Sequence, residues 1–172
     1  MKKKNIIFLV GFMGSGKTTL GKALAVKLNL KFLDTDERII QLENQPIDEI
    51  FNKNGEDYFR SLESEVLKEI CFNNESRVIS TGGGFPCFND NMTKMLNSGF
   101  VVYISADPTT LYNRLENDSK RPLLKSNSNL REYIVDSLMK REPIYKRAHL
   151  ILDASELPHS ILNQISQGWK NF

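Results

Sequence analysis

Short apolar runs rich in β-branched residues recur along the chain, separated by longer polar or amphipathic stretches. An apolar run of this length is typical of a strand that is buried on both faces. We therefore predict buried strands at residues 5–10, 31–34, 77–80, 100–105 and 149–153.

The stretches between these runs carry apolar residues at helical spacing. Examples are Leu20, Leu24 and Leu28 within 18–29, and Phe59, Leu62, Val66 and Ile70 within 56–71. Strands that alternate with helices predict β-α-β crossovers and a parallel sheet. The expected fold class is therefore α/β, with three α/β/α layers around a central five-stranded parallel sheet. Ligands of such folds bind beyond the carboxyl ends of the strands.

Length and charge narrow the class of protein. With 172 residues, 40% of them hydrophobic, residues 1–172 suit a single domain with a sizeable core. The net charge of +2 gives no strong field toward nucleic acid or an anionic membrane, so we expect neither as a partner.

The N-terminal sequence MKKKNIIFLVGFM places three lysines before an apolar run, as secretory signals do. No small-residue cleavage site follows, and the run is shorter than the ~20 residues of a membrane span. Cys71 and Cys87 form no C-x-x-C motif and are expected to be reduced, buried thiols. These features predict a soluble cytoplasmic protein.

Residues 117–129, NDSKRPLLKSNSN, are polar apart from a Leu pair and interrupt the helical pattern. We interpret them as a mobile surface loop. Helical spacing resumes at 130–142, and Pro143 is a candidate site for a kink or a restart of that helix.

The sequence GFMGSGKT, residues 11–18, matches the phosphate-binding motif G-x-x-x-x-G-K-[ST] and lies between a predicted strand and a predicted helix. Its glycines allow successive backbone N–H groups to point at a phosphate, and the helix adds its positive end. Lys17 can reach the β- and γ-phosphates, and the Thr18 hydroxyl can ligate Mg²⁺, whereas Thr19 lies outside the required pattern. The implied ligand is a magnesium nucleoside triphosphate.

The class of nucleotide enzyme follows from what accompanies the motif. GTPases usually carry N-K-x-D after a strand, and the nearest string, NKNGED at 52–57, lacks the aspartate in the right place. A large motor ATPase needs a longer chain. A small-molecule kinase is the leading hypothesis.

Two aspartates lie at the carboxyl end of the second predicted strand, one as its last residue and one just beyond it. Strand residues two apart point to one face, so Asp34 and Asp36 could both face the same cleft. Enzymes with this phosphate-binding motif use an aspartate at the end of a strand to hold Mg²⁺. Asp34 is the best candidate for this metal side of the site, because the other candidate, Asp107, is followed by Pro108 and resembles a helix N-cap. Asp36 could itself be a helix N-cap or a ligand, and its spacing favours neither.

Glycines and arginines supply further candidates. Gly82, Gly83 and Gly84 follow a buried strand, which favours close approach of the backbone to a ligand. Arg60 and Arg141 lie in amphipathic helices, where either could simply face solvent. Arg121, in the polar loop, could close over the phosphates as part of a lid.

Taken in order, these motifs resemble the shikimate kinase family, within the small P-loop kinases related to nucleoside monophosphate kinases. The resemblance covers nearly the whole chain and includes GFMGSGKTTLG at 11–21, LDTD at 33–36, IDEIF and GEDYFR within 47–60, STGGG at 80–84, RPLL at 121–124 and KREPIYKRA at 140–148. Residues 152–160 resemble the adenine-side loop of that family only loosely.

The resemblance implies roles for residues whose spacing left them open. Asp34 would lie on the Mg²⁺ side and Asp36 would accept hydroxyl groups of shikimate. Arg60 and Arg141 would clamp the substrate carboxylate, a planar anion that suits a guanidinium fork. The other implied substrate residues are Gly82, Gly83, Gly84, Phe51, Phe59 and Glu63, with Glu63 orienting Arg60 from one helical turn away.

The resemblance also implies an ATP site and a reaction. The implied ATP-binding residues are Gly14, Ser15, Gly16, Lys17, Thr18, Thr19, Arg114, which would stack on adenine, and the lid arginine Arg121. The catalytic residues would be Lys17, Asp36 and Arg121, with Mg²⁺ as cofactor. The lid would span about 117–129 and the substrate-binding helices about 36–63.

The implied reaction is transfer of the γ-phosphoryl group of ATP to the 3-hydroxyl of shikimate, on the route to chorismate and the aromatic amino acids. A base role for Asp36 would add little to a loose transition state. We expect a monomer, because no long exposed apolar stripe is visible. The alternatives are a small kinase of gluconate or of a nucleotide, and a nucleotide-binding regulatory module without catalysis.

Overall fold

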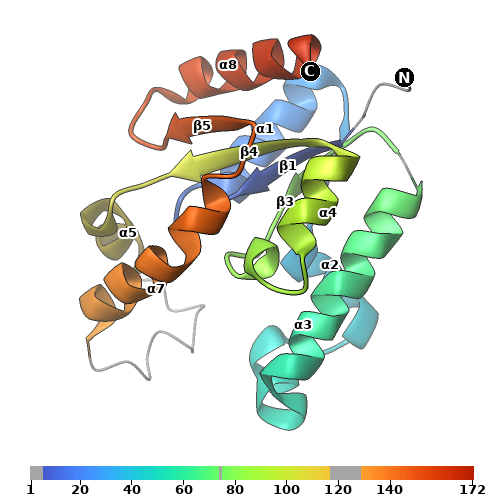
Figure 1. Cartoon of the computed structure of the whole chain (residues 1–172), viewed down its shortest axis with the longest axis vertical. Helices are drawn as coiled ribbons and strands as arrows, with labels where there is room; N and C mark the ends of the chain where they lie inside the picture. The colour runs from blue at the N-terminus through green and yellow to red at the C-terminus, as the bar shows by residue number, and fades with distance from the viewer. Residues whose placement is uncertain (1–5, 74, 117–128) are drawn as a thin grey trace.

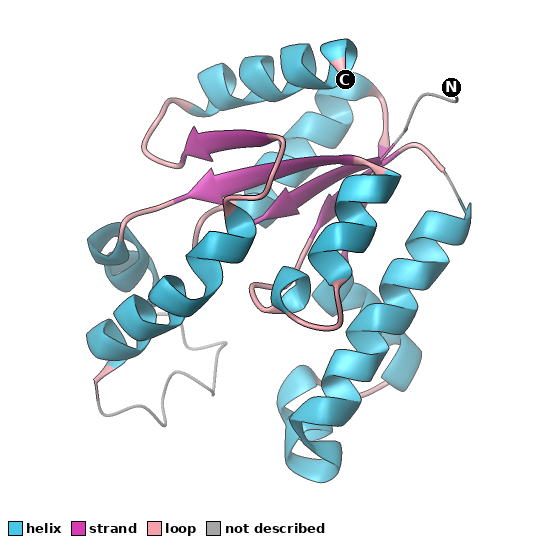
Figure 2. Ribbon diagram, in the orientation of Figure 1, coloured by secondary structure: helices cyan, strands magenta, loops and turns pink. Residues whose placement is uncertain are grey.

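The protein forms a five-stranded parallel sheet with helices on both faces, which confirms the predicted α/β class (Figures 1 and 2). The computed structural model describes residues 6–73, 75–116 and 129–172. The strand order is β2-β3-β1-β4-β5, and every neighbouring pair is parallel. The strands are β1 (Ile6–Val10), β2 (Lys31–Asp34), β3 (Arg77–Ser80), β4 (Phe100–Ser105) and β5 (Leu150–Asp153).

The predicted bounds of the strands are confirmed to within one residue at each end, but the edge strands β2 and β5 are only partly buried, because each has a neighbouring strand on one side only. The inner strand β1 is completely buried, as expected for a strand covered on both faces. Its side chains alternate between two cores: Ile7 and Leu9 belong to one, and Ile6, Phe8 and Val10 to the other.

Each core is closed by its own set of helices (Figure 1). Helices α1 (Lys17–Leu28) and α8 (Pro158–Asn171) cover one face, whereas α2 (Thr35–Glu43), α3 (Ile47–Asn73), α4 (Asn91–Ser98) and the end of α7 (Leu130–Tyr145) cover the other. Helix α5 (Pro108–Leu115) packs with α7 in a third, smaller core around Phe12. A short 3₁₀-helix, η1 (Phe85–Cys87), lies between β3 and α4.

Local sequence explains several helix boundaries. The Asp107 carboxylate accepts hydrogen bonds from the backbone N–H groups of Thr109 and Thr110, which confirms the predicted N-cap before Pro108. Helix α3 bends at Gly55, whose φ of 83° is costly for residues with a side chain. Pro143 neither ends nor restarts α7, which continues to Tyr145.

The prediction for Asp34 and Asp36 requires a correction. The strand ends at Asp34, so the two side chains do not share a strand face, and Asp36 lies in the first turn of α2. The N-cap of α2 is Asp34, whose carboxylate accepts a hydrogen bond from the backbone N–H of Asp36 at 3.0 Å. The N-cap alternative for Asp36 is therefore wrong.

Two further predictions can be compared with the structure. Cys71 and Cys87 are free thiols that pack against the core, and burial raises the pKa of Cys87 to about 11, so its thiol is neutral at physiological pH. The predicted lid at 117–129, with Arg121, lies outside the described residues except for Asn129, the N-cap of α7.

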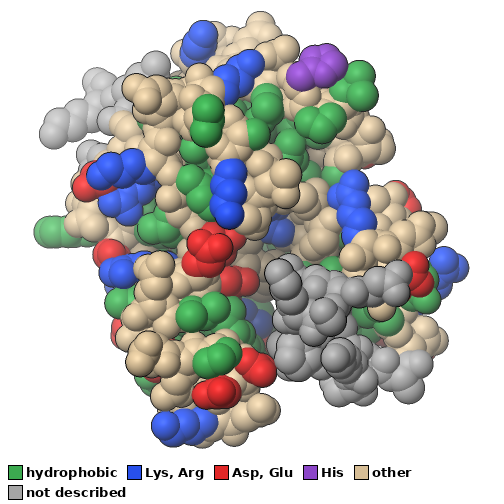
Figure 3. Space-filling view, turned by 180° about the vertical axis from the view of Figure 1, so that it is seen from behind, with side chains coloured by type: hydrophobic (Ala, Val, Ile, Leu, Met, Phe, Trp, Pro, Cys, Tyr) green, Lys and Arg blue, Asp and Glu red, His purple; other side chains and the backbone are tan. Residues whose placement is uncertain are grey.

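The surface carries both signs of charge. On the face seen in Figure 3, Lys and Arg side chains are interspersed with Asp and Glu side chains. Among the residues that the structure describes, no helix is both long and apolar enough to cross a membrane.

Candidate active site

The phosphate-binding loop connects β1 to α1 at the carboxyl edge of the sheet. Gly14 and Gly16 have φ values of 81° and 96°, a conformation that glycine adopts without the strain of a Cβ atom. Lys17 is buried in the first turn of α1, and its Nζ donates a hydrogen bond to the Phe12 carbonyl at 2.8 Å. The loop thus holds its cation close to the helix N-terminus, where a phosphate would gain from both.

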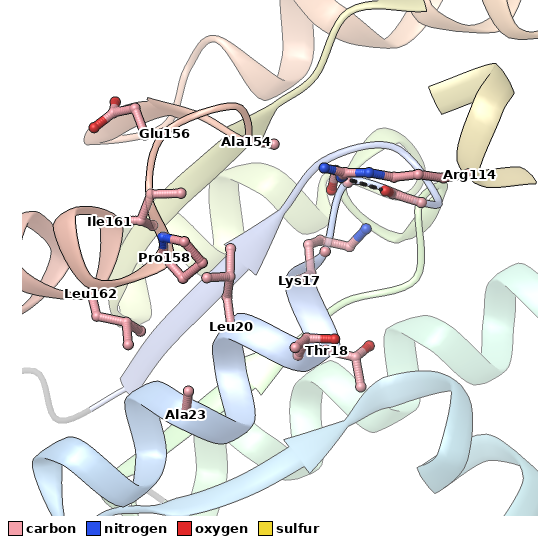
Figure 4. A pocket seen from close by; sticks show the side chains of 14 residues that line it. Lys17, Thr18, Leu20, Ala23, Arg114, Ala154, Glu156, Pro158, Ile161 and Leu162 are labelled. Carbon is pink, nitrogen blue, oxygen red and sulfur yellow. Dashed lines mark hydrogen bonds between the residues drawn. The ribbon is translucent and has the colours of Figure 1, made fainter. Parts of the chain in front are cut away.

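A cavity of about 510 Å³ opens beside this loop (Figure 4). Its lining is Gly14, Ser15, Gly16, Lys17, Thr18, Thr19, Leu20, Ala23, Arg114, Ala154, Glu156, Pro158, Ile161 and Leu162. Every described residue predicted for the ATP site therefore lines one cavity. Its volume lies in the range of small-molecule and cofactor sites, roughly 300–1,000 Å³.

Two sides of the cavity differ in chemistry. Arg114 Nη1 donates a hydrogen bond to the Gly14 carbonyl at 3.0 Å, which places the guanidinium against the phosphate loop. On the other side, Pro158 and Ile161 give an apolar wall (Figure 4). A planar base can fit between a guanidinium and an apolar wall. Pro158 and Glu156 belong to the segment 152–160, in which sequence reasoning assigned no contact.

Three oxygen-bearing side chains meet at the start of α1. Thr18 Oγ1 donates a hydrogen bond to Asp34 Oδ2 at 2.9 Å and lies 3.2 Å from Ser80 Oγ. Asp34 and Ser80 are register partners at the carboxyl ends of β2 and β3. Carboxylate and hydroxyl oxygens suit Mg²⁺, so the chemistry of this cluster fits the predicted metal side.

Three charged side chains lie close to Gly82, Gly83 and Gly84, the glycine triplet that follows β3. A methyl group added at Gly82 would collide with the Asp36 carboxylate, and one at Gly83 would lie 3.7 Å from Arg141 Nη1. A methyl group at Gly84 would lie 2.7 Å from Arg60 Nη1. The structure therefore brings Asp36, Arg60 and Arg141 together around the triplet.

Arg60 is held by two glutamates on its own helix. Its Nη1 donates to Glu63 Oε2 at 2.8 Å, and its Nη2 donates to Glu56 Oε1 at 2.9 Å. Burial raises the pKa of Glu63 from 4.5 to about 7, although the ion pair with Arg60 opposes that rise. Burial acts to lower the pKa of Arg60, but the two glutamates outweigh it and raise that pKa. Arg60 is therefore a permanent cation beside a carboxyl group that can titrate.

Aromatic side chains surround the two arginines. Phe51 and Phe59 pack with ring centroids 4.6 Å apart, and the Arg60 Cζ lies 5.5 Å from the Phe59 ring. The Arg141 Cζ lies 5.6 Å from the ring of Phe12. One turn after Arg141 on α7, the Tyr145 hydroxyl donates to the Gly83 carbonyl at 2.5 Å. This bond ties the helix of Arg141 to the triplet.

Several residues of the site had not been singled out in the sequence. Ser80 could have been predicted from the sequence, because it is the last residue of a predicted strand and ligands bind at that end of a parallel sheet. Thr35 accepts a hydrogen bond from the Gly82 N–H at 2.9 Å, but only the paired strands place these residues together. Tyr145 and Glu56 belong to quoted motifs but lack a pattern that sets them apart from structural residues.

Comparison with known proteins agrees with this geometry. The family model for shikimate kinase matches residues 13–169. The chain is 44% identical over 154 residues to the shikimate kinase of Phocaeicola vulgatus, which covers 88% of this chain and 87% of the relative. It is 41% identical over 160 residues to the shikimate kinase of Persephonella marina, covering 92% of this chain and 95% of the relative.

Solved structures give the same result. The crystal structure of the Bacteroides thetaiotaomicron shikimate kinase superposes with a TM-score of 0.88 at 40% identity, covering 94% of this chain and 96% of that one. The Acinetobacter baumannii shikimate kinase in complex with shikimate also gives 0.88, at 34% identity, with coverages of 95% and 91%. A gluconokinase from Sinorhizobium meliloti, at 12% identity and a TM-score of 0.59, shares the fold alone. The chain belongs to the shikimate kinase family.

Proposed function

We propose that this chain transfers the γ-phosphoryl group of ATP to the 3-hydroxyl of shikimate, giving shikimate 3-phosphate and ADP. One observation carries the proposal: Asp36, Arg60 and Arg141 converge on the glycine triplet that follows β3, beside the phosphate loop that follows β1. Strands β1 and β3 are neighbours, so both sites lie at one edge of the sheet. Family membership and a relative crystallised with shikimate support the same reaction.

The two arginines suit the carboxylate of the acid substrate. Arg60 and Arg141 lie against adjacent glycines, whose lack of side chains allows the two guanidinium groups to approach this part of the backbone closely. Guanidinium groups can bind a carboxylate through paired N–H donors, which fixes its orientation as well as its position. Phe51 and Phe59 would pack against the ring of the substrate.

Asp36 suits the hydroxyl end of the substrate. An ionised carboxylate accepts hydrogen bonds only, so it selects a group that donates, such as a sugar-like hydroxyl. We assign to Asp36 the orientation of the acceptor hydroxyl toward the γ-phosphate. Phosphoryl transfer depends mainly on such positioning and on charge stabilisation.

Lys17 and the backbone N–H groups of the loop would hold the phosphates of ATP. The buried hydroxyl of Ser15 has no hydrogen-bond partner among the described residues, so a phosphate oxygen could satisfy it. Arg114 would pack against adenine from one side, with Pro158 opposite. Arg121, outside the described residues, remains the predicted lid cation.

We further propose that Mg²⁺ accompanies ATP. Thr18 would ligate it directly, and Asp34 and Ser80, which are register partners, would orient that hydroxyl, since an oxygen of each lies within hydrogen-bonding distance of it. Bound Mg²⁺ supplies positive charge to the phosphate oxygens. We also expect the chain to act as a cytoplasmic monomer on small molecules, without nucleic acid or a membrane, and light scattering tests the monomer.

The experiment that tests the reaction is an ADP-release assay with Mg-ATP and a panel of acceptors: shikimate, gluconate, nucleoside monophosphates and none. We expect ADP only with shikimate, and one new phosphate on the acid by mass spectrometry. Release of ADP with another acceptor would mean that the chain is a kinase, but it would refute the proposal that Arg60 and Arg141 bind the carboxylate of shikimate. Shikimate binding without ADP release would favour the regulatory module.

A further inference from the structure

The Arg60 guanidinium carbon lies over an aromatic ring from another part of the chain. This atom, Cζ, lies 3.9 Å from the centroid of Phe88, nearer than to Phe59 on its own helix, at 5.5 Å. Phe88 immediately follows η1 and is half-buried. A cation over a ring face at this distance is within the range of a cation–π contact, and a ring this near the guanidinium carbon limits how far the group can tilt toward it.

The edges of the same guanidinium are divided between three neighbours. Glu56 Oε1 accepts from both Nε and Nη2, at 3.2 and 2.9 Å, and so occupies the side edge. Glu63 accepts from Nη1. A methyl group on Gly84 would lie 2.7 Å from Nη1, 2.9 Å from Nη2 and 3.1 Å from Cζ. Because that point is nearer to both terminal nitrogens than to Cζ, Gly84 lies at the end of the fork, and its lack of a side chain keeps clear the edge that a carboxylate can bind.

The segment that carries Phe88 is itself fixed to α3. Asn89 Nδ2 donates to the Arg60 carbonyl and to Ser64 Oγ, both at 3.1 Å. Asn89 and Asp90 adopt left-handed φ values of 51° and 57°, which turn the chain sharply after Phe88. The Asn89 side chain therefore joins the backbone of Arg60 to the residue next to Phe88, which fixes the ring relative to the arginine.

We infer that Phe88 is a positioning residue that aims the free end of the Arg60 fork at the substrate carboxylate. This inference rests on the proposed function and assigns to Phe88 a role that none of the sequence motifs carries. The glutamates restrain rotation of the guanidinium within its plane, whereas the ring restrains its tilt. Without the ring, Arg60 keeps its charge and both ion pairs but can turn its fork away from Gly84.

The test compares Phe88→Met, which keeps bulk but removes the aromatic face, with Phe88→Tyr, which keeps the face. We expect Phe88→Met to raise the KM for shikimate about 5- to 30-fold, the equivalent of a partly buried cation–π contact, with kcat and the KM for ATP changed less than twofold. Phe88→Tyr should remain within about twofold of wild type. Phe72→Leu, at a ring that is 89% exposed at the end of α3, is the matched control and should change nothing.

A double-mutant cycle separates positioning from a general structural effect. In an Arg60→Ala background, Phe88→Met should have no further effect on the KM for shikimate, because the ring acts through the arginine. Phe88→Leu serves as a second variant if Phe88→Met does not fold. An equal rise in KM in both backgrounds, or equal losses with Met and Tyr, would overturn the inference.

The same measurements distinguish failure of this inference from failure of the proposed function. If the wild-type protein releases no ADP with shikimate, the proposed function fails and the inference fails with it. If the wild-type protein phosphorylates shikimate but Phe88→Met keeps the wild-type KM for shikimate, only the inference is refuted.

Discussion

The carboxylate of Asp36 lies directly against Gly82, in the space that a side chain at residue 82 would need. The contact joins the first turn of α2 to the segment after β3, and it is reinforced by the hydrogen bond from the Gly82 N–H to the Thr35 hydroxyl. The glycine is required here by close approach, since its φ lies outside the left-handed region. Its absent side chain therefore determines where the carboxylate sits.

Replacing Gly82 with alanine should displace Asp36 while leaving the sheet intact. The new methyl group would overlap the carboxylate, which must move by about 1 Å, and a misplacement of that size can lower a rate about 100-fold. We expect kcat/KM for shikimate to fall by about that factor. Calorimetry should show that ADP binds as in wild type, and shikimate kinetics close to wild type would rule out the contact as a constraint on catalysis.

The metal side offers a second prediction, at a residue that a search for acidic groups alone overlooks. Ser80 Oγ lies 3.2 Å from Thr18 Oγ1, so removing it loosens the hydroxyl that is proposed to ligate Mg²⁺. Ser80→Ala should raise the Mg²⁺ concentration needed for half-maximal rate roughly 10-fold, as changes around metal ligands commonly do. Thr93→Ala on α4, outside the cavity, is the control. An unchanged Mg²⁺ titration would remove Ser80 from the metal side.

How much of this could be predicted from the sequence differs between the sheet and the site. The inner strands β1, β3 and β4 follow from apolar runs, because burial on both faces leaves few polar positions in them, whereas the edge strands β2 and β5 are short apolar runs that are only partly buried. The cap at Asp107 follows from its place before Pro108, and the phosphate loop from its glycines and lysine. These signals are local, so a single stretch of chain contains all the information that each one needs.

The substrate side depends on contacts between distant segments. Spacing could not decide whether Arg60 and Arg141 face solvent, because the glycines they meet are more than twenty residues away in sequence from Arg60 and more than fifty from Arg141. Asp34 illustrates a different reason for error. Strand alternation assumed that β2 extends to residue 36, whereas the chain turns into α2 directly after Asp34, whose carboxylate caps the helix and accepts from Thr18. Resemblance to a family supplied the roles that local patterns could not.

Arg141 provides a third prediction, which separates its role from that of a surface residue. Arg141→Ala should raise the KM for shikimate about 10- to 100-fold, since a hydrogen bond between charged groups contributes about 1.5–3 kcal/mol. The KM for ATP should change little. Arg131→Ala on the exposed side of the same helix is the control. Equal kinetics for the two variants would place Arg141 outside the substrate site.

The last prediction concerns the titration of Glu63. Burial raises its pKa from 4.5 to about 7 in the folded protein, against the opposing effect of Arg60. The folded state therefore holds this proton more tightly than the unfolded chain does. Between pH 4.5 and about 7 the unfolded chain binds fewer protons at this residue, so the free energy of unfolding must fall as pH rises through that range.

Glu63→Gln isolates this effect because glutamine does not titrate. The free energy of unfolding of wild type minus that of Glu63→Gln should decrease from pH 4.5 to about 7 and then become constant. The full decrease is up to about 3 kcal/mol, at about 1.4 kcal/mol for each unit of pKa difference. Urea denaturation of both proteins at several pH values measures it. Glu65→Gln, at an exposed position of the same helix α3, is the control, and its difference from wild type should not follow this course. A wild-type advantage that increases with pH would mean that the ion pair with Arg60 outweighs burial and that Glu63 stays ionised throughout.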